Sequence, residues 1–179
     1  MLFLSVLTGL LLILSIPPLP RVLGLTALRD RARWAAGLGF AVAGSLHFLS
    51  PASYLRLMPP YLPWSLPLIY VSGFFEILGG LGLLLPGTRR AAAWGLVALL
   101  VAVFPANLHV ALNAISVEGL PTWYGWVRLP FQALYIWWVL ASTSLPRLSY
   151  GAALLPSVVA FIDIGLVLVI FKGDVRLRP

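Results

Sequence analysis

Six long apolar runs, separated by turn-forming residues, dominate this sequence. They cover residues 2–16, 34–49, 66–85, 91–113, 127–141 and 152–171, and segments with Pro or Gly, such as 58–60, 86–87 and 119–121, divide them. About 20 apolar residues are needed to cross a bilayer, and a backbone in lipid must form its hydrogen bonds internally, so each run should be a helix. We therefore predict an all-α integral membrane protein: an antiparallel four-helix bundle core with one extra hydrophobic helix at each end, about six transmembrane spans.

Composition supports the same class. Hydrophobic residues make up 61% of the chain and charged residues only 9%, too few polar groups to cover a soluble globule of 179 residues. The net charge of +7 then indicates cytoplasmic loops and contact with the lipid bilayer, and we expect no nucleic acid partner. Cysteine is absent, which excludes disulfide catalysis and thiolate metal ligation. Any redox role would need a bound cofactor.

The chain is predicted to form a single membrane domain over residues 1–179. Within it we expect an N-terminal anchor helix at 1–25, a four-helix core at 33–142 and an additional C-terminal helix at 150–172. The first run, 2–16, would reach only about 22 Å as a helix, so it must continue toward residue 25 to cross the bilayer. An uncleaved anchor is favoured over a signal peptide, because no basic residue precedes the run and no small-x-small cleavage site follows it.

The distribution of arginine predicts the orientation. One side of the bundle collects Arg21, Arg29, Arg31, Arg33, Arg89, Arg90 and Arg147. This side should be cytoplasmic. The other side holds Arg56, Arg128, Glu118 and the aromatic residues Tyr54, Tyr61, Trp64, Trp123, Tyr124 and Trp126, which suit a membrane interface. The sixth span disagrees, because a full crossing would leave Lys172, Arg176 and Arg178 outside.

Polar residues within the apolar runs are the candidate site. Glu76 lies near the middle of its run, where a charge costs about 3 kcal/mol or more. Other polar residues fall at similar depths in the outer half of neighbouring runs. The predicted ligand and proton pocket consists of His47, Glu76, Asn107, His109, Arg128 and Gln132. We expect Glu76 to receive hydrogen bonds from a neighbouring helix. Alternatively, such residues only join helices, at about 0.6 kcal/mol each. Asp163 raises the same question without an obvious partner.

Spacing along the runs adds detail. Gly73 and Gly80 lie three residues before and four after Glu76, so the carboxylate should sit in a groove of small residues that packs closely on a neighbour. His109 and Asn113 share a helix face at i, i+4. Pro105 should free the carbonyl of Val101 for another bond.

Other chemistries find little support. Two His and one Glu would suffice as ligands, but no HxxxH or ExxH spacing places two of them on one helix face, so we predict no metal site. No GxSxG elbow is present, and the GGLG segment at 79–82 lies inside an apolar run rather than in a phosphate-binding loop.

One series of residues resembles the DoxX-like family of small bacterial four-helix membrane proteins over about residues 33–140. The series is Gly44-Ser-Leu-His47-Phe48, Pro51, Tyr54, Met58-Pro59, Ser72-Gly73, Glu76, Gly79-Gly80, Leu83-Leu84, Arg89, Asn107 and Arg128-Leu-Pro-Phe-Gln132. The resemblance implies a bacterial inner-membrane protein with a polar pocket. For some members it implies a role as the membrane subunit of thiosulfate:quinone oxidoreductase, with quinone as the ligand. A related branch works with thiol chemistry, which the absence of cysteine rules out here.

Two classes of function remain. In the first, an exoplasmic-side pocket binds a quinone or another small apolar ligand as part of a membrane redox system, and Glu76 exchanges a proton. In the second, the chain is a non-catalytic accessory or assembly subunit of a larger electron-transfer or photosynthetic membrane complex. A proton-coupled transporter fits less well, because no inverted repeat is visible. Whether the chain is itself an enzyme is left open.

Overall fold

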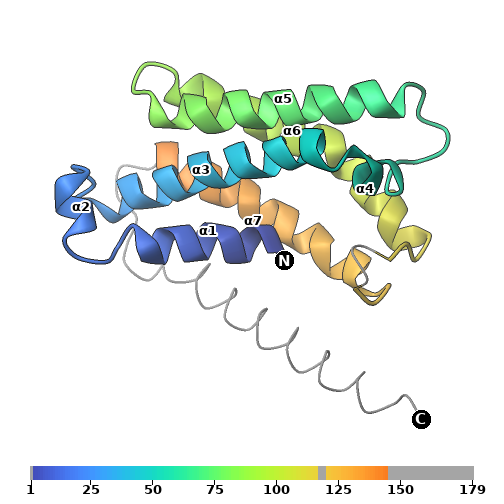
Figure 1. Cartoon of the computed structure of the whole chain (residues 1–179), viewed down its shortest axis with the longest axis horizontal. Coiled ribbons are helices and arrows are strands. Elements are labelled where there is room, and N and C mark those ends of the chain that lie inside the picture. Colours follow the sequence, from blue (N-terminus) through green and yellow to red (C-terminus); the bar gives the residue numbers. More distant parts are fainter. Residues whose placement is uncertain (1, 117–119, 145–179) are drawn as a thin grey trace, which may run out of the picture.

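The computed structural model describes residues 2–116 and 120–144, and within these residues the chain is helical and contains no strand (Figure 1). The helices are α1 (Leu2–Ile13), α2 (Leu19–Val22), α3 (Leu28–Leu49), α4 (Pro51–Leu55), α5 (Ser65–Leu84), α6 (Arg89–Leu112) and α7 (Tyr124–Ser144). The all-α prediction is confirmed for these residues. The predicted sixth run lies outside the described residues, as do Arg147, Asp163, Glu118, Lys172, Arg176 and Arg178.

The ends of the helices follow from local sequence. Helix α3 stops at Leu49, and Pro51 then opens the short helix α4. Helices α5 and α6 are joined by a tight turn in which the Thr88 hydroxyl donates a hydrogen bond to the carbonyl oxygen of Gly82. Pro105 and Pro130 both lie inside helices, so neither ends the element that contains it. The long helices thus match the apolar runs to within a few residues, except that α3 starts earlier, at Leu28.

Four long helices, α3, α5, α6 and α7, form an antiparallel bundle (Figure 1). Arg29 at the start of α3 donates hydrogen bonds to carbonyl oxygens of Ser142 and Thr143 at the end of α7, so these helices run in opposite directions. Nearby, the indole N–H of Trp138 donates to the carbonyl oxygen of Ala32. Such bonds between a side chain and the backbone of another helix fix the register in which α3 and α7 pack.

Helix α1 lies against α3 and α7 (Figure 1). The Phe3 ring contacts Phe40 of α3 and Tyr135 of α7, with centroid separations of 4.9 and 5.0 Å. Leu7 and Leu11 are buried in the main hydrophobic core. The N-terminal run therefore belongs to the packed core of the bundle and is more than a separate anchor.

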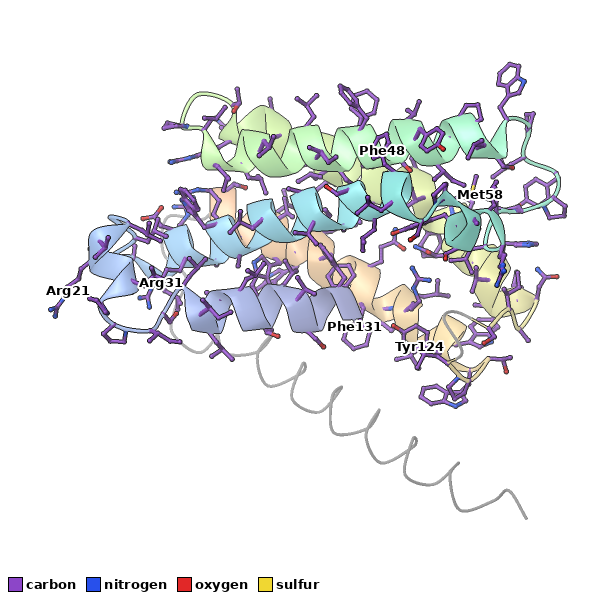
Figure 2. All side chains as sticks on the ribbon, viewed as in Figure 1. Arg21, Arg31, Phe48, Met58, Tyr124 and Phe131 are labelled. Atoms are coloured by element: carbon purple, nitrogen blue, oxygen red, sulfur yellow. The ribbon has the colours of Figure 1, made fainter. Side chains whose placement is uncertain are left out.

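The two ends of the bundle differ in character. Arg21 and Arg31 lie at one end, and Met58 and Tyr124 lie toward the other (Figure 2). The N-termini of α3 and α6 and the C-terminus of α7 meet at the basic end, so the described arginines predicted to share a side do so, while Arg147 is not described. The aromatic end exposes Tyr61, Trp64 and Trp126.

Helices α5 and α6 are long and apolar enough to cross a membrane. By the same measure, no other helix of the described residues qualifies, so the six spans stay a prediction.

Candidate functional site

Glycines bring α3 and α5 into backbone contact and so position Glu76 and His47. A Cβ atom added to Gly44 would lie 2.5 Å from the carbonyl oxygen of Gly73, and one added to Gly73 would lie 2.6 Å from the Cβ of His47. About two turns away, Gly37 and Gly80 meet in the same reciprocal way. No larger residue fits these positions without moving a helix. We call this contact the glycine seam: Gly37 and Gly44 of α3 with Gly73 and Gly80 of α5.

Glu76 and His47 face each other across the glycine seam. Each residue follows a seam glycine by three positions, Gly73 and Gly44 respectively, so each side chain projects from the same helix face as its glycine. The Nδ1 atom of His47 lies 3.6 Å from the Oε2 atom of Glu76. Both atoms are buried, and neither has a hydrogen-bond partner among the described residues. At this separation the two atoms do not hydrogen-bond to each other, so His47 does not donate the hydrogen bond that we expected Glu76 to receive from a neighbouring helix.

Helix α4 covers this pair. The Tyr54 ring packs on the His47 imidazole with centroids 4.0 Å apart. The sequence analysis placed Tyr54 in the aromatic interface and in the DoxX-like series, but not in the predicted pocket. The break at Ser50 and Pro51 turns α4 back over the end of α3, so the spacing expected of one continuous helix could not have predicted this contact.

Asn107 and Gln132 form a different group, between α6 and α7. The Nδ2 of Asn107 donates to the Oε1 of Gln132 at 3.0 Å, and the Nε2 of Gln132 donates to the carbonyl oxygen of Leu100. The sequence predicted an available carbonyl at Val101, but the acceptor is its neighbour Leu100. Leu100 is buried, whereas Val101 lies on the exposed side of α6. This network is satisfied and joins two helices.

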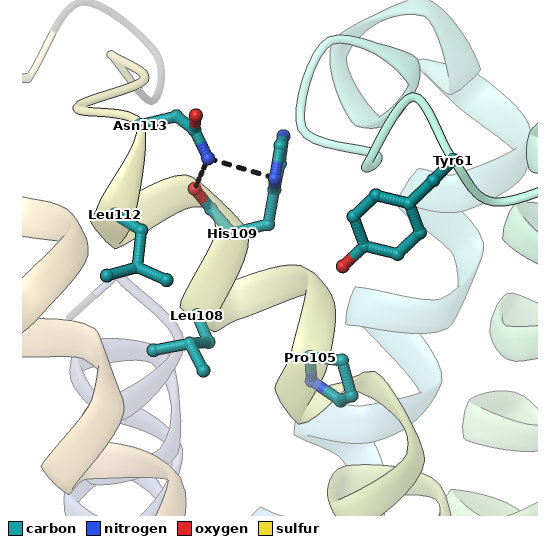
Figure 3. Close-up of a pocket in the computed structure, with 6 residues that line it drawn as sticks. All are labelled: Tyr61, Pro105, Leu108, His109, Leu112 and Asn113. Atoms are coloured by element: carbon teal, nitrogen blue, oxygen red, sulfur yellow. Dashed lines mark hydrogen bonds between the residues drawn. The ribbon is translucent and has the colours of Figure 1, made fainter.

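His109 belongs to a third group, a pocket at the aromatic end (Figure 3). The pocket has a volume of about 430 Å³ and is lined by Tyr61, Pro105, Leu108, His109, Leu112 and Asn113. The Nδ2 of Asn113 lies 2.9 Å from the carbonyl oxygen of His109 and 3.0 Å from its Nδ1. Tyr61, which approaches the imidazole edge-on, was again predicted only as an interface residue.

Arg128 stands apart from these groups. It lies near the start of α7, is partly exposed, and forms no hydrogen bond or ion pair with another residue in 2–116 or 120–144. Arg128 therefore forms no ion pair with Glu76. The contacts thus separate the six predicted site residues. His47 lies with Glu76 and Asn107 with Gln132, whereas His109 contacts Asn113, which was not a predicted site residue, and Arg128 is alone.

In the described part of the chain, no group of three His, Asp or Glu side chains could hold a metal ion.

Comparison with known families gives one match. Residues 36–143, more than half of the chain, match the model of a family described as a domain of unknown function (DUF8561). No curated protein and no solved structure matches the chain. The matched range begins inside α3 and ends inside α7, so it contains the whole glycine seam and the site residues, and it leaves out α1 and α2.

Proposed function

This chain belongs to the DUF8561 family, and we propose that it is a multi-pass membrane protein whose Glu76–His47 pair binds the polar end of a small apolar ligand and exchanges a proton with it. The ligand class is a quinone or a molecule of similar chemistry, as the DoxX-like resemblance implies. The location we propose is a bacterial inner membrane.

The surface of the helices supports a place in the membrane. Helix α5 exposes Phe74, Phe75 and Leu78, and α6 exposes Trp94 and Val101, each at about half or more of its full area. Large apolar side chains exposed to this extent are unfavourable in water but match lipid tails. Both helices are long and apolar enough to cross a membrane. A core helix of a soluble protein would instead be mostly buried.

The two unlike ends support an orientation. Arginines gather at the end formed by the N-termini of α3 and α6, and Tyr61, Trp64 and Trp126 are exposed at the other. We propose that the basic end is cytoplasmic. Because the chain has no cysteine, single cysteines can be introduced without background. Thr88→Cys should resist a membrane-impermeant thiol reagent in intact cells, and Thr122→Cys should react. The reverse pattern would contradict the orientation.

The single observation behind the ligand proposal is the unsatisfied pair. A buried carboxylate oxygen and a buried imidazole nitrogen each lose about 1–3 kcal/mol if they remain without a partner. Polar groups at membrane depth have no bulk water to pair with, so they normally mark a substrate or proton path. A ligand oxygen beside the pair, at hydrogen-bond distance from both Oε2 and Nδ1, would satisfy both atoms.

The chemistry of the two groups suits proton exchange. A carboxyl and an imidazole can each donate or accept one proton, and a bound group that hydrogen-bonds to both could carry the proton from one to the other. Tyr54 shields the imidazole from the outer surface. The chain would bind the ligand and move its proton, while a partner enzyme would supply the electrons of a redox reaction.

Glu76→Gln tests the proposal. The amide keeps the size of the side chain but cannot exchange a proton, so the fold should persist while binding of decylubiquinone, used as the probe, weakens at least tenfold in lipid nanodiscs. The matched control is Gly95→Ala, at an α6 position where an added Cβ meets open space. Binding should be unchanged in the control.

The same experiment also tests the second hypothesis, that the chain is a non-catalytic accessory subunit. If Glu76→Gln binds decylubiquinone as well as the parent chain does, and complexes still assemble, the pair has no ligand role. The chain would then act only through contacts with partner proteins.

A further inference from the structure

We infer that the pocket between Tyr61 and His109 is a second binding site, selective for a small apolar molecule that carries a hydrogen-bond-accepting oxygen. This goes beyond the proposed function, because it concerns a separate group of residues and holds whether or not Glu76 exchanges a proton.

The orientation of the Asn113 amide can be deduced from its contacts. One of the two terminal atoms of the Asn113 side chain lies 2.9 Å from the carbonyl oxygen of His109. A carbonyl oxygen only accepts hydrogen bonds, so this atom must be the NH₂ nitrogen rather than the amide oxygen. The same nitrogen lies 3.0 Å from the Nδ1 of His109 and has a second hydrogen available for it (Figure 3).

The state of the His109 imidazole follows. Because Nδ1 accepts a hydrogen from Asn113, it carries none of its own, and the ring proton is on Nε2. The Nε2–H group is then a hydrogen-bond donor, and it makes no hydrogen bond to any residue that the structure describes. Asn113 is thus a positioning residue, and His109, which lines the pocket, presents a fixed donor at its edge.

The rest of the pocket selects an apolar body. Pro105, Leu108 and Leu112 supply apolar walls, and Figure 3 shows the Tyr61 hydroxyl directed toward α6 between Pro105 and His109. A volume of about 430 Å³ lies in the range of small-molecule sites, which combine apolar walls with a few fixed polar groups. A ring system with one carbonyl oxygen fits this set: the rings meet the walls, and the oxygen accepts the Nε2–H.

A matched pair of probes tests the inference: 2-acetonaphthone, whose carbonyl accepts hydrogen bonds, and 2-ethylnaphthalene, which has the same rings without the oxygen. Binding is measured in nanodiscs of ether-linked lipids, which lack the ester carbonyls that could compete for His109. One hydrogen bond should make the ketone bind about three- to tenfold more tightly than the hydrocarbon. The ¹³C-labelled carbonyl stretch of the bound ketone should move to lower frequency.

Variants then assign the donor. In His109→Phe the ratio of the two affinities should fall to about one and the carbonyl stretch should no longer shift, whereas Gly95→Ala on the same helix should preserve both. Equal affinities of the parent chain for the two probes, or an unshifted carbonyl, would overturn the inference without needing any variant. Retention of the ratio in His109→Phe would overturn the assignment to His109.

The role of Asn113 has its own readout. ¹⁵N spectra of the imidazole should show His109 with an unprotonated Nδ1 in the parent chain and a mixture of tautomers in Asn113→Leu. Since the chain has two histidines, His47→Gln assigns the signals. An unchanged tautomer in Asn113→Leu would show that Asn113 does not orient the ring.

Discussion

The contact between α3 and α5 and the contact between α6 and α7 both contain polar side chains, but only one of them satisfies those side chains. Across α6 and α7, Asn107, Gln132 and the carbonyl of Leu100 form a continuous chain of hydrogen bonds. Across α3 and α5, Glu76 and His47 face each other at 3.6 Å with a buried atom left unpaired on each. The backbones of α3 and α5 are also the more closely packed, through the glycine seam.

The difference indicates how stability and function are divided. Neutral amide side chains that hydrogen-bond to each other add modestly to helix association and require no additional hydrogen-bond partner. Ionisable groups held without partners cost stability, and natural proteins keep such costs mainly at functional sites. The tight packing of the glycine seam offsets the cost of the Glu76–His47 pair and holds the pair in place.

The largest effect is expected where a side chain would separate α3 from α5. The Cβ of Gly80→Ala would lie 2.5 Å from the carbonyl oxygen of Gly37 and 2.9 Å from the backbone nitrogen of Ala41, and backbone atoms cannot move aside locally. We expect a loss of about 3 kcal/mol or more in the free energy of unfolding, measured by denaturant titration in detergent. Gly95→Ala, with open space around its Cβ, should be close to neutral. Equal losses of stability in Gly80→Ala and Gly95→Ala would mean that close packing at the glycine seam does not stabilise the bundle.

An intermediate effect is expected at the satisfied contact. Gln132→Leu should destabilise the protein by about 1–3 kcal/mol, because Asn107 then loses its acceptor inside the bundle. The double variant Asn107→Leu with Gln132→Leu should cost less than the sum of the two single variants, since no amide is left unpaired. Additive costs in this cycle would show that the two amides do not interact.

The smallest effect is expected at the unsatisfied pair. Glu76→Leu should lower the free energy of unfolding by no more than about 0.5 kcal/mol, and it could even raise it. No hydrogen bond within the described residues is lost, and a buried polar atom is removed. If Glu76 received hydrogen bonds from a neighbouring helix, as we expected from the sequence, its removal would instead leave those donors unpaired and destabilise the protein. A loss of 2 kcal/mol or more would reveal a partner of Glu76 outside the described residues.

Much of the helical framework could be predicted from the sequence. Apolar runs and the turn formers between them placed α5 within one residue at each end, since a backbone among apolar side chains has few alternatives to a helix. The grouping of the described arginines at one end followed from counting helices that alternate in direction. Even the small-residue groove around Glu76 was visible, because residues three and four apart share a helix face.

The pairing of the polar groups could not be predicted. Depth counted along separate runs suggested one pocket for His47, Glu76, Asn107 and Gln132, yet their contacts form two groups. Depth is one coordinate of a side chain, and the rotation of each helix about its axis decides which neighbour the side chain meets. That rotation is set by packing, for example by Gly73 lying against Gly44.

The sequence by itself determined the elements of this protein: which segments are helices, which ends carry arginine, and that Glu76 would lie within an apolar helix. Only the tertiary structure decided that His47 is the neighbour of Glu76, that α4 brings Tyr54 over them, and that α1 packs into the core. The physical reason is that hydrophobicity and turn preferences act over a few neighbouring residues, whereas the choice of partner depends on close packing between segments far apart in the chain.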